Sequence, residues 1–135
     1  NVMFDLPAWQ QSTHVRTGLP VWLGEVIATG GLLLVIGALT RTARASLGPI
    51  AVPAWIGAAY FFTSSTSFAN PAVTIGRSLT DTFSGIAPAS VPAFIGFQIV
   101  GAAVGALLIE YLYPRHGAAE PLDLPGPVHS GPDSA

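Results

Sequence analysis

The chain has 135 residues, enough for one ordinary domain, and only 9% of them are charged, against about 25% in soluble globular proteins. This composition excludes a small water-soluble globule, and the net charge of -2 excludes a basic surface for nucleic acid. The chain has no cysteine and its three histidines are scattered, so we expect no metal site and no cofactor. We expect an all-α membrane protein embedded in a lipid bilayer.

The chain opens with a mixed, polar segment over residues 1–20, which predicts a loop outside the membrane. An apolar stretch follows over residues 21–40 and is interrupted only by Glu25. At about 1.5 Å per residue, a helix of this length crosses a hydrocarbon core of about 30 Å. Two more apolar stretches, over residues 48–63 and 90–113, predict two further membrane-spanning helices.

Small residues and prolines mark the later part of the chain. Gly101 and Gly105 stand four residues apart in the third apolar stretch, a spacing that lets membrane helices approach closely. Residues 114–135 are rich in proline and acidic residues, which predicts a disordered tail because such a segment buries little apolar surface.

The arginines predict the orientation of the helices. Arg41 and Arg44 lie in the short connection over residues 41–47, and Arg115 follows the third helix. Three crossings place these two regions on the same side of the membrane, and the positive-inside rule makes that side cytoplasmic. We therefore expect a multi-pass protein of the cell membrane with the 41–47 loop and the tail in the cytoplasm.

Residues 64–80 lie between the second and third helices and carry no charge before Arg77. Asn70 and Pro71 form a helix-start signal, because asparagine caps free amides and proline fits the first helical position. The following helix is too short to span, so the segment predicts a re-entrant loop: an extended stretch, then a half-helix that enters the membrane part-way. Its exposed carbonyls and the Asn70 amide would line a narrow polar track.

The triplet Asn70-Pro71-Ala72 at this place, with the Glu25-x-x-x-Thr29 pattern in the first helix, resembles the aquaporin (major intrinsic protein) family. The resemblance implies a passive channel for water or small uncharged solutes, such as glycerol-like polyols and undissociated metalloid acids. Members of the family have two inverted repeats of three helices. The chain therefore resembles the C-terminal half of a six-span channel, which would need its N-terminal half as a partner, and the family implies a homotetramer.

The resemblance also suggests which residues set selectivity. Most members have an arginine directly after the second triplet, where this chain has Val73. Counting back from Asn70 gives Ser67 and Ala58 as the other filter positions of this half. With Ala58, Ser67 and Val73 the constriction would be wide and mostly apolar. Arg77, one turn beyond Val73, either guards the outer vestibule or anchors the segment at the membrane interface.

Three other functions fit the sequence less well than a channel does: a transporter fragment, a structural membrane subunit and an enzyme. A fragment of a secondary transporter can also contain broken helices, but coupling needs converging carboxylates and the apolar stretches hold few. A structural membrane subunit does not account for the polar segment before Asn70. We expect no enzyme activity, because no nucleophile–base pair is present. Glu25 either carries protons or acts as a structural acid that binds the amides of the re-entrant segment.

Overall fold

The computed structural model describes residue 7 and residues 9–115. All regular elements within this part are helical, which confirms the all-α class. Three of the helical segments are long and apolar enough to cross a membrane. The predicted tail, apart from Pro114 and Arg115, lies outside the described residues, as does most of the first part of the predicted loop over residues 1–20.

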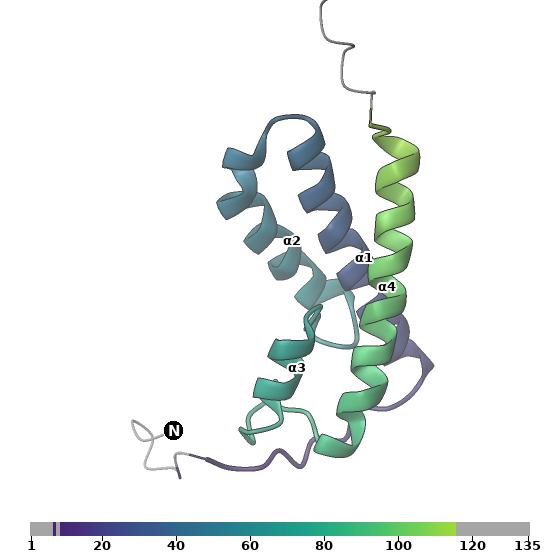
Figure 1. Ribbon diagram of the computed structural model, residues 1–135. Coiled ribbons are helices and arrows are strands. Elements are labelled where there is room, and N and C mark those ends of the chain that lie inside the picture. The colour runs from purple at the N-terminus through teal and green to yellow at the C-terminus, as the bar shows by residue number, and fades with distance from the viewer. Residues whose placement is uncertain (1–6, 8, 116–135) are drawn as a thin grey trace, which may run out of the picture.

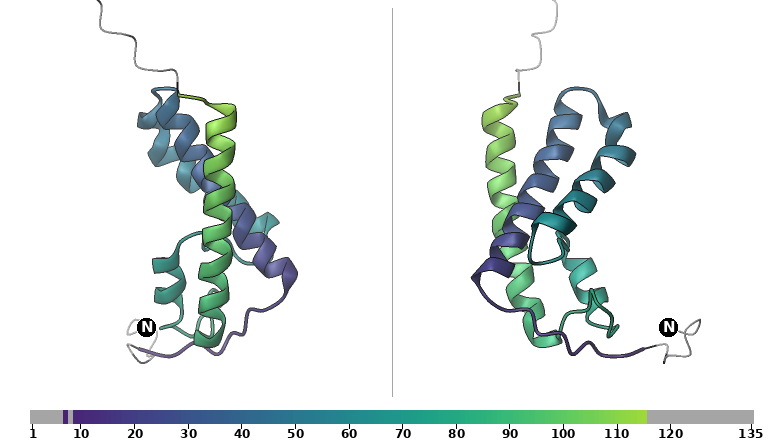
Figure 2. Two further views of the ribbon diagram at one scale, coloured as in Figure 1. Left: turned by 45° about the vertical axis from the view of Figure 1, so that its right-hand side comes forward. Right: turned by 180° about the vertical axis from the view of Figure 1, so that it is seen from behind.

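Three long helices and one short one form the fold (Figure 1). In chain order the elements are α1 (Leu19–Arg41), the 3₁₀ turn η2 (Ala45–Leu47), α2 (Gly48–Phe62), α3 (Pro71–Arg77), the 3₁₀ turn η3 (Pro88–Ser90) and α4 (Val91–Leu112). Helix α1 crosses α4 and carries α2 on its other side, whereas α3 lies beside the first half of α4 (Figure 2). We call the end that holds residues 9–18 and 78–90 the loop end; it is the lower end in Figure 1.

Glycines permit the close crossing of α1 and α4. A Cβ atom added at Gly101 would lie 2.6 Å from the Val26 carbonyl oxygen, and one added at Gly105 would lie 2.6 Å from the Gly30 carbonyl oxygen. The two backbones therefore touch, as is typical of small residues at this spacing in membrane helices. The pair that the sequence singled out packs α4 against α1 within the same chain.

Helix α2 is held against α1 by a tryptophan. The Trp55 ring covers Gly31, where an added Cβ would lie 1.9 Å from the ring. Its Nε1 donates to the Ala28 carbonyl oxygen at 3.0 Å, which fixes the ring between the two helices. Because Ala28 and Ala59 are both fully buried, the helices meet through small side chains on this face as well.

The opposite end of the bundle is closed by charged groups. Arg41, at the last residue of α1, pairs with Glu110 of α4 and donates to the Tyr113 carbonyl oxygen. Arg115 approaches the same Glu110 carboxylate at 3.5 Å. These contacts tie the ends of α1 and α4 together at the side where the short connection η2 lies.

The close crossing of α1 and α4 predicts that alanine substitution lowers the stability of the protein at one glycine of α4 but not at another. We expect Gly101→Ala to lower the unfolding midpoint in detergent by the equivalent of about 1–3 kcal/mol, since the new methyl group meets the α1 backbone. Gly96 has open space around the position of an added Cβ. Gly96→Ala is therefore the matched control and should leave the midpoint unchanged or slightly higher, because alanine favours helix. Equal midpoints for the two variants would contradict the crossing.

Candidate functional site

The segment before the half-helix differs from the extended stretch expected from sequence. Thr66, Ser67 and Ala69 have left-handed backbone, with φ of 62°, 43° and 49°. Each such residue costs about 1–3 kcal/mol when it is not glycine, so the surrounding structure must hold it. The sequence alone predicts extended backbone here because none of these residues favours the left-handed region.

Glu25 holds this segment from behind. Its carboxylate is fully buried and accepts hydrogen bonds from the backbone amides of Phe68 at 2.9 Å and Ala69 at 3.0 Å. Successive residues of an extended strand face opposite sides, so one carboxylate would not bind two neighbouring amides there. The left-handed residues turn both amides to one side, and Glu25 binds both.

The same carboxylate connects to the half-helix through α4. Gln98 donates from Nε2 to Glu25 at 2.6 Å and to the Thr74 hydroxyl at 2.8 Å. The Thr74 hydroxyl in turn donates to the Asn70 carbonyl oxygen at 2.9 Å. This buried network joins α1, α4 and α3, and every contact of Glu25 in it is with an N–H donor.

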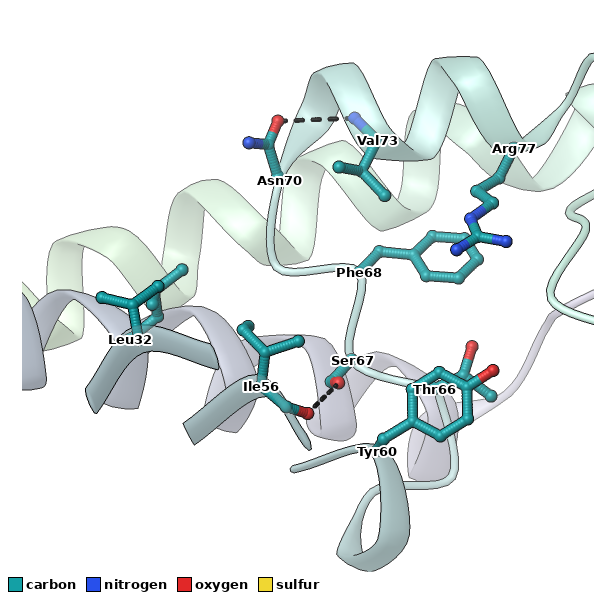
Figure 3. Close-up of a pocket in the computed structure, with 10 residues that line it drawn as sticks. Leu32, Ile56, Tyr60, Thr66, Ser67, Phe68, Asn70, Val73 and Arg77 are labelled. Atoms are coloured by element: carbon teal, nitrogen blue, oxygen red, sulfur yellow. Dashed lines mark hydrogen bonds between the residues drawn. The ribbon is translucent and has the colours of Figure 1, made fainter. Parts of the chain in front are cut away.

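Asn70 caps α3 as the sequence predicts. Its side-chain oxygen accepts from the Ala72 amide at 2.8 Å and the Val73 amide at 3.4 Å, and Pro71 occupies the first helical position. Because the oxygen is used in this way, the side-chain nitrogen is left to point into open space (Figure 3). Within the described residues that nitrogen makes no hydrogen bond.

A groove of about 300 Å³ runs past this asparagine. Figure 3 shows Val73 and Arg77 facing it from α3, and Ile56 and Tyr60 from α2. One wall is apolar, and the other is made by residues 66–69, which we call the left-handed segment. The lining residues are Leu32, Val52, Ile56, Tyr60, Thr66, Ser67, Phe68, Asn70, Val73 and Arg77.

The structure brings together most of the residues singled out from the sequence. Asn70, Ser67, Val73 and Arg77 line the groove, whereas Pro71 and Ala72 form the first turn of α3 beside it. Glu25 lies behind the segment and is closed off from the groove.

Ala58 is not among the residues that line the groove. The lining residues of α2 are four apart, Val52, Ile56 and Tyr60, and therefore share one helix face. Ala58 lies about 200° round the helix from Ile56, on the opposite face. Counting back from Asn70 missed Tyr60, although the spacing of four in α2 could have indicated it.

The left-handed segment presents unused hydrogen-bond acceptors. In the described part of the chain, no hydrogen bond reaches the carbonyl oxygens of residues 66–69. Ser67, Phe68 and Ala69 are more than nine-tenths buried, and the Thr66 hydroxyl is buried without a partner. Because Thr66, Ser67 and Phe68 line the groove, this run of acceptors borders the space that runs past Asn70.

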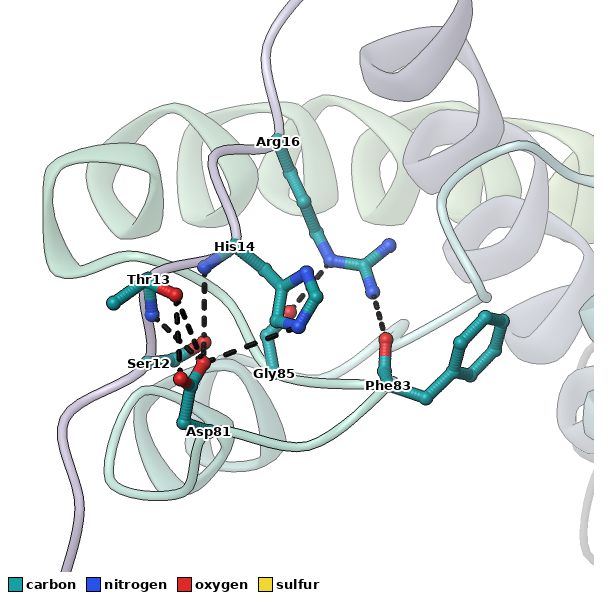
Figure 4. A network of polar contacts seen from close by, with 7 residues as sticks. All are labelled: Ser12, Thr13, His14, Arg16, Asp81, Phe83 and Gly85. Atoms are coloured by element: carbon teal, nitrogen blue, oxygen red, sulfur yellow. Dashed lines mark hydrogen bonds and ion pairs between the residues drawn. The ribbon is translucent and has the colours of Figure 1, made fainter.

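A strap over residues 10–16 closes the loop end. Its backbone bonds to the segment after α3, with the Gln10 amide 3.1 Å from the Leu79 carbonyl oxygen and the Ser12 amide 3.0 Å from that of Ser78. Asp81 accepts from the Thr13 amide at 2.9 Å (Figure 4). This backbone hydrogen bond is the main reason why the pKa of Asp81 lies below its ordinary value.

The double use of the Glu25 carboxylate predicts that Glu25→Gln is destabilising. Glutamine offers a single acceptor oxygen, so either Phe68 or Ala69 is left with a buried amide without an acceptor, at a cost of about 1–3 kcal/mol. The unfolding midpoint in detergent should fall and hydrogen exchange at these two amides should accelerate. Glu110→Gln, which changes an exposed carboxylate, is the control and should leave that exchange unchanged. Unaltered exchange in Glu25→Gln would show that the carboxylate does not hold the segment.

The strap should loosen in acid. Because the folded pKa of Asp81 is lowered, its bond to Thr13 stabilises the strap above the unfolded pKa of about 3.9. That stabilisation is lost as the pH falls through the lower folded pKa. We expect the protection factor of the Thr13 amide to stay constant down to about pH 5 and to drop below about pH 4. Asp81→Asn should remove this pH dependence; a drop that persists in the variant would assign it to another group.

The chain is similar to a curated membrane channel protein. The aquaglyceroporin AqpS of Rhizobium meliloti (strain 1021) is 46% identical over 112 residues, which are 83% of this chain and 48% of that protein. The chain thus spans about half the length of the curated relative that it matches. No family model matches the chain, and no solved structure matches it with statistical significance. Identity at this level, together with three membrane-spanning helices and a capped half-helix, shows that the chain belongs to the aquaporin (major intrinsic protein) family.

Proposed function

We propose that the chain forms one wall of a channel through which water or small uncharged solutes permeate passively. The observation that carries this proposal is the run of carbonyl oxygens over residues 66–69 that accept no hydrogen bond in the described part of the chain. Thr66, Ser67 and Phe68 of this run line the groove. Asn70 lines it as well, and its side-chain nitrogen makes no hydrogen bond within the described residues. A solute with hydroxyl or amide hydrogens exchanges its water shell for these groups as it passes.

The two sides of the groove favour solutes that combine polar and apolar groups. Leu32, Val52 and Ile56 offer only carbon atoms on one side, whereas the left-handed segment offers acceptors on the other. Val73 and Ser67 add little bulk and no charge. A glycerol-like polyol or an undissociated metalloid acid fits this arrangement, since each presents hydroxyl hydrogens and carries no charge to be desolvated.

A transporter is the second candidate, and the buried acid argues against it. Coupling to an ion gradient needs carboxylates that converge on a site. The contacts of Glu25 are with N–H donors, and the described residues hold no cluster of three metal-ligating side chains. Glu110 lies at the far end of α4 and pairs with Arg41.

The chain forms one wall of the proposed channel, and we propose that a second half of the channel supplies the other. AqpS is about twice as long as the matched part, which leaves room for another repeat. In the proposed channel the loop end faces outward, the 41–47 connection and the tail face the cytoplasm of a cell-membrane protein, and four copies assemble as in the family. The arginines Arg41, Arg44 and Arg115 at the opposite end support this orientation.

Flux through proteoliposomes that contain the complete channel tests the proposal. A channel gives glycerol flux that rises linearly with concentration and depends weakly on temperature. Saturation with a requirement for an ion gradient would favour the transporter instead. Protein-free vesicles set the background.

Within the same assay, Val73→Arg should reduce glycerol flux by about tenfold or more. The long charged side chain would project into the groove that Val73 now lines, and it would narrow the passage. Val73→Ala is the control for the site and should not lower the flux, because it removes bulk. Unchanged glycerol flux in Val73→Arg would count against Val73 as a filter residue.

A further inference from the structure

The Arg16 side chain contacts several backbone groups at the loop end. Its Nε donates to the Gly85 carbonyl oxygen at 2.7 Å and its Nη2 to that of Phe83 at 2.9 Å (Figure 4). Its Nη1 reaches the Ser65 carbonyl oxygen at 3.5 Å, and the guanidinium lies 5.5 Å from the centre of the Phe68 ring. One side chain therefore connects the loop before η3 with Ser65 and Phe68.

The position of Arg16 is itself fixed. Its backbone amide donates to the Ser90 hydroxyl at 3.1 Å, and the Ala87 amide donates to the His14 carbonyl oxygen at 2.7 Å. No carboxylate of the described residues lies within ion-pair distance of the guanidinium. Its positive charge is met by backbone carbonyl groups and an aromatic face, and its partial burial lowers the pKa of Arg16.

The contacts of Arg16 lie on either side of two left-handed residues that line the groove. Ser65 and Phe68 stand on either side of Thr66 and Ser67, which are left-handed and line the groove. Glu25 holds the Phe68 and Ala69 amides, but nothing in that network touches Ser65. Arg16 is the charged group that reaches this earlier flank.

We propose that Arg16 is a positioning residue that determines selectivity: it holds the backbone of residues 65–68 against the loop over residues 83–85 and so sets the width of the groove. The inference rests on the proposed channel function. Arg16 acts through the backbone of the segment and is not among the residues that line the groove. Without it, the segment loses its contacts at Ser65 and at the Phe68 ring, and the passage widens.

The planar guanidinium is required for this role. Arginine presents several N–H donors in a rigid fork and stacks on aromatic rings. A lysine ammonium keeps the charge but is a single point, so it cannot bond all three carbonyl groups and cover Phe68 at once. Arg16→Lys therefore separates the effect of geometry from the effect of charge, and Arg16→Gln removes both.

The test compares two polyols of different size in proteoliposomes with the complete channel. We expect the ratio of ribitol flux to glycerol flux to rise by about three- to tenfold in both Arg16 variants, the factor that corresponds to loss of about one net hydrogen bond. Arg44 is exposed at the other end of the molecule, and among the described residues its side chain makes no ion pair. Arg44→Lys and Arg44→Gln are the matched controls and should keep the wild-type ratio.

The outcomes separate the two proposals. If the wild type conducts glycerol but Arg16→Lys keeps the wild-type ratio, the positioning role is overturned and the channel function stands. A parallel fall of both fluxes at constant ratio reports only less folded protein and also overturns the role. If the wild type conducts neither polyol above protein-free vesicles, the channel function fails, and this inference fails with it.

Discussion

The Glu25 carboxylate is the interaction on which the rest of the site depends. A membrane gives no water to buried amides, so a re-entrant segment is tolerated only where protein groups satisfy its backbone. Glu25 binds two successive amides and, through Gln98, the half-helix. Two of the amides that it binds lie next to left-handed residues, each of which costs about 1–3 kcal/mol.

Much of the fold could be predicted because the membrane restricts the choices. Long uncharged stretches predict spanning helices, and Asn70-Pro71 is a helix-start signal whose capping bonds the structure shows. The prediction of close packing at Gly101 and Gly105 also depends on local spacing alone. Such features are set by residues near one another in the sequence, so a single chain reveals them.

The parts that the sequence did not reveal depend on distant residues. The left-handed backbone of residues 66, 67 and 69 arises because Glu25, more than 40 positions away, binds the amides of this segment. Tyr60 lines the groove because Trp55 fixes the rotation of α2 against α1. Nothing in the sequence around Arg16 indicates its role, because its contact with Gly85 forms only when the strap folds over the loop end. Counting along the chain does not capture these effects.

The backbone N–H donors and the backbone carbonyl acceptors around Asn70 differ in whether they are bound. The amides of residues 68, 69, 72 and 73 are all bound by the side chains of Glu25 and Asn70, whereas the carbonyl oxygens over residues 66–69 stay unbound in the described part. A groove lined by carbonyl oxygens would attract cations as well as neutral donors. Arg77 on its wall, and Arg16 behind Phe68, place positive charge at the loop end. In the proposed channel these two charges oppose the entry of cations, although Val73 stands where most family members carry arginine.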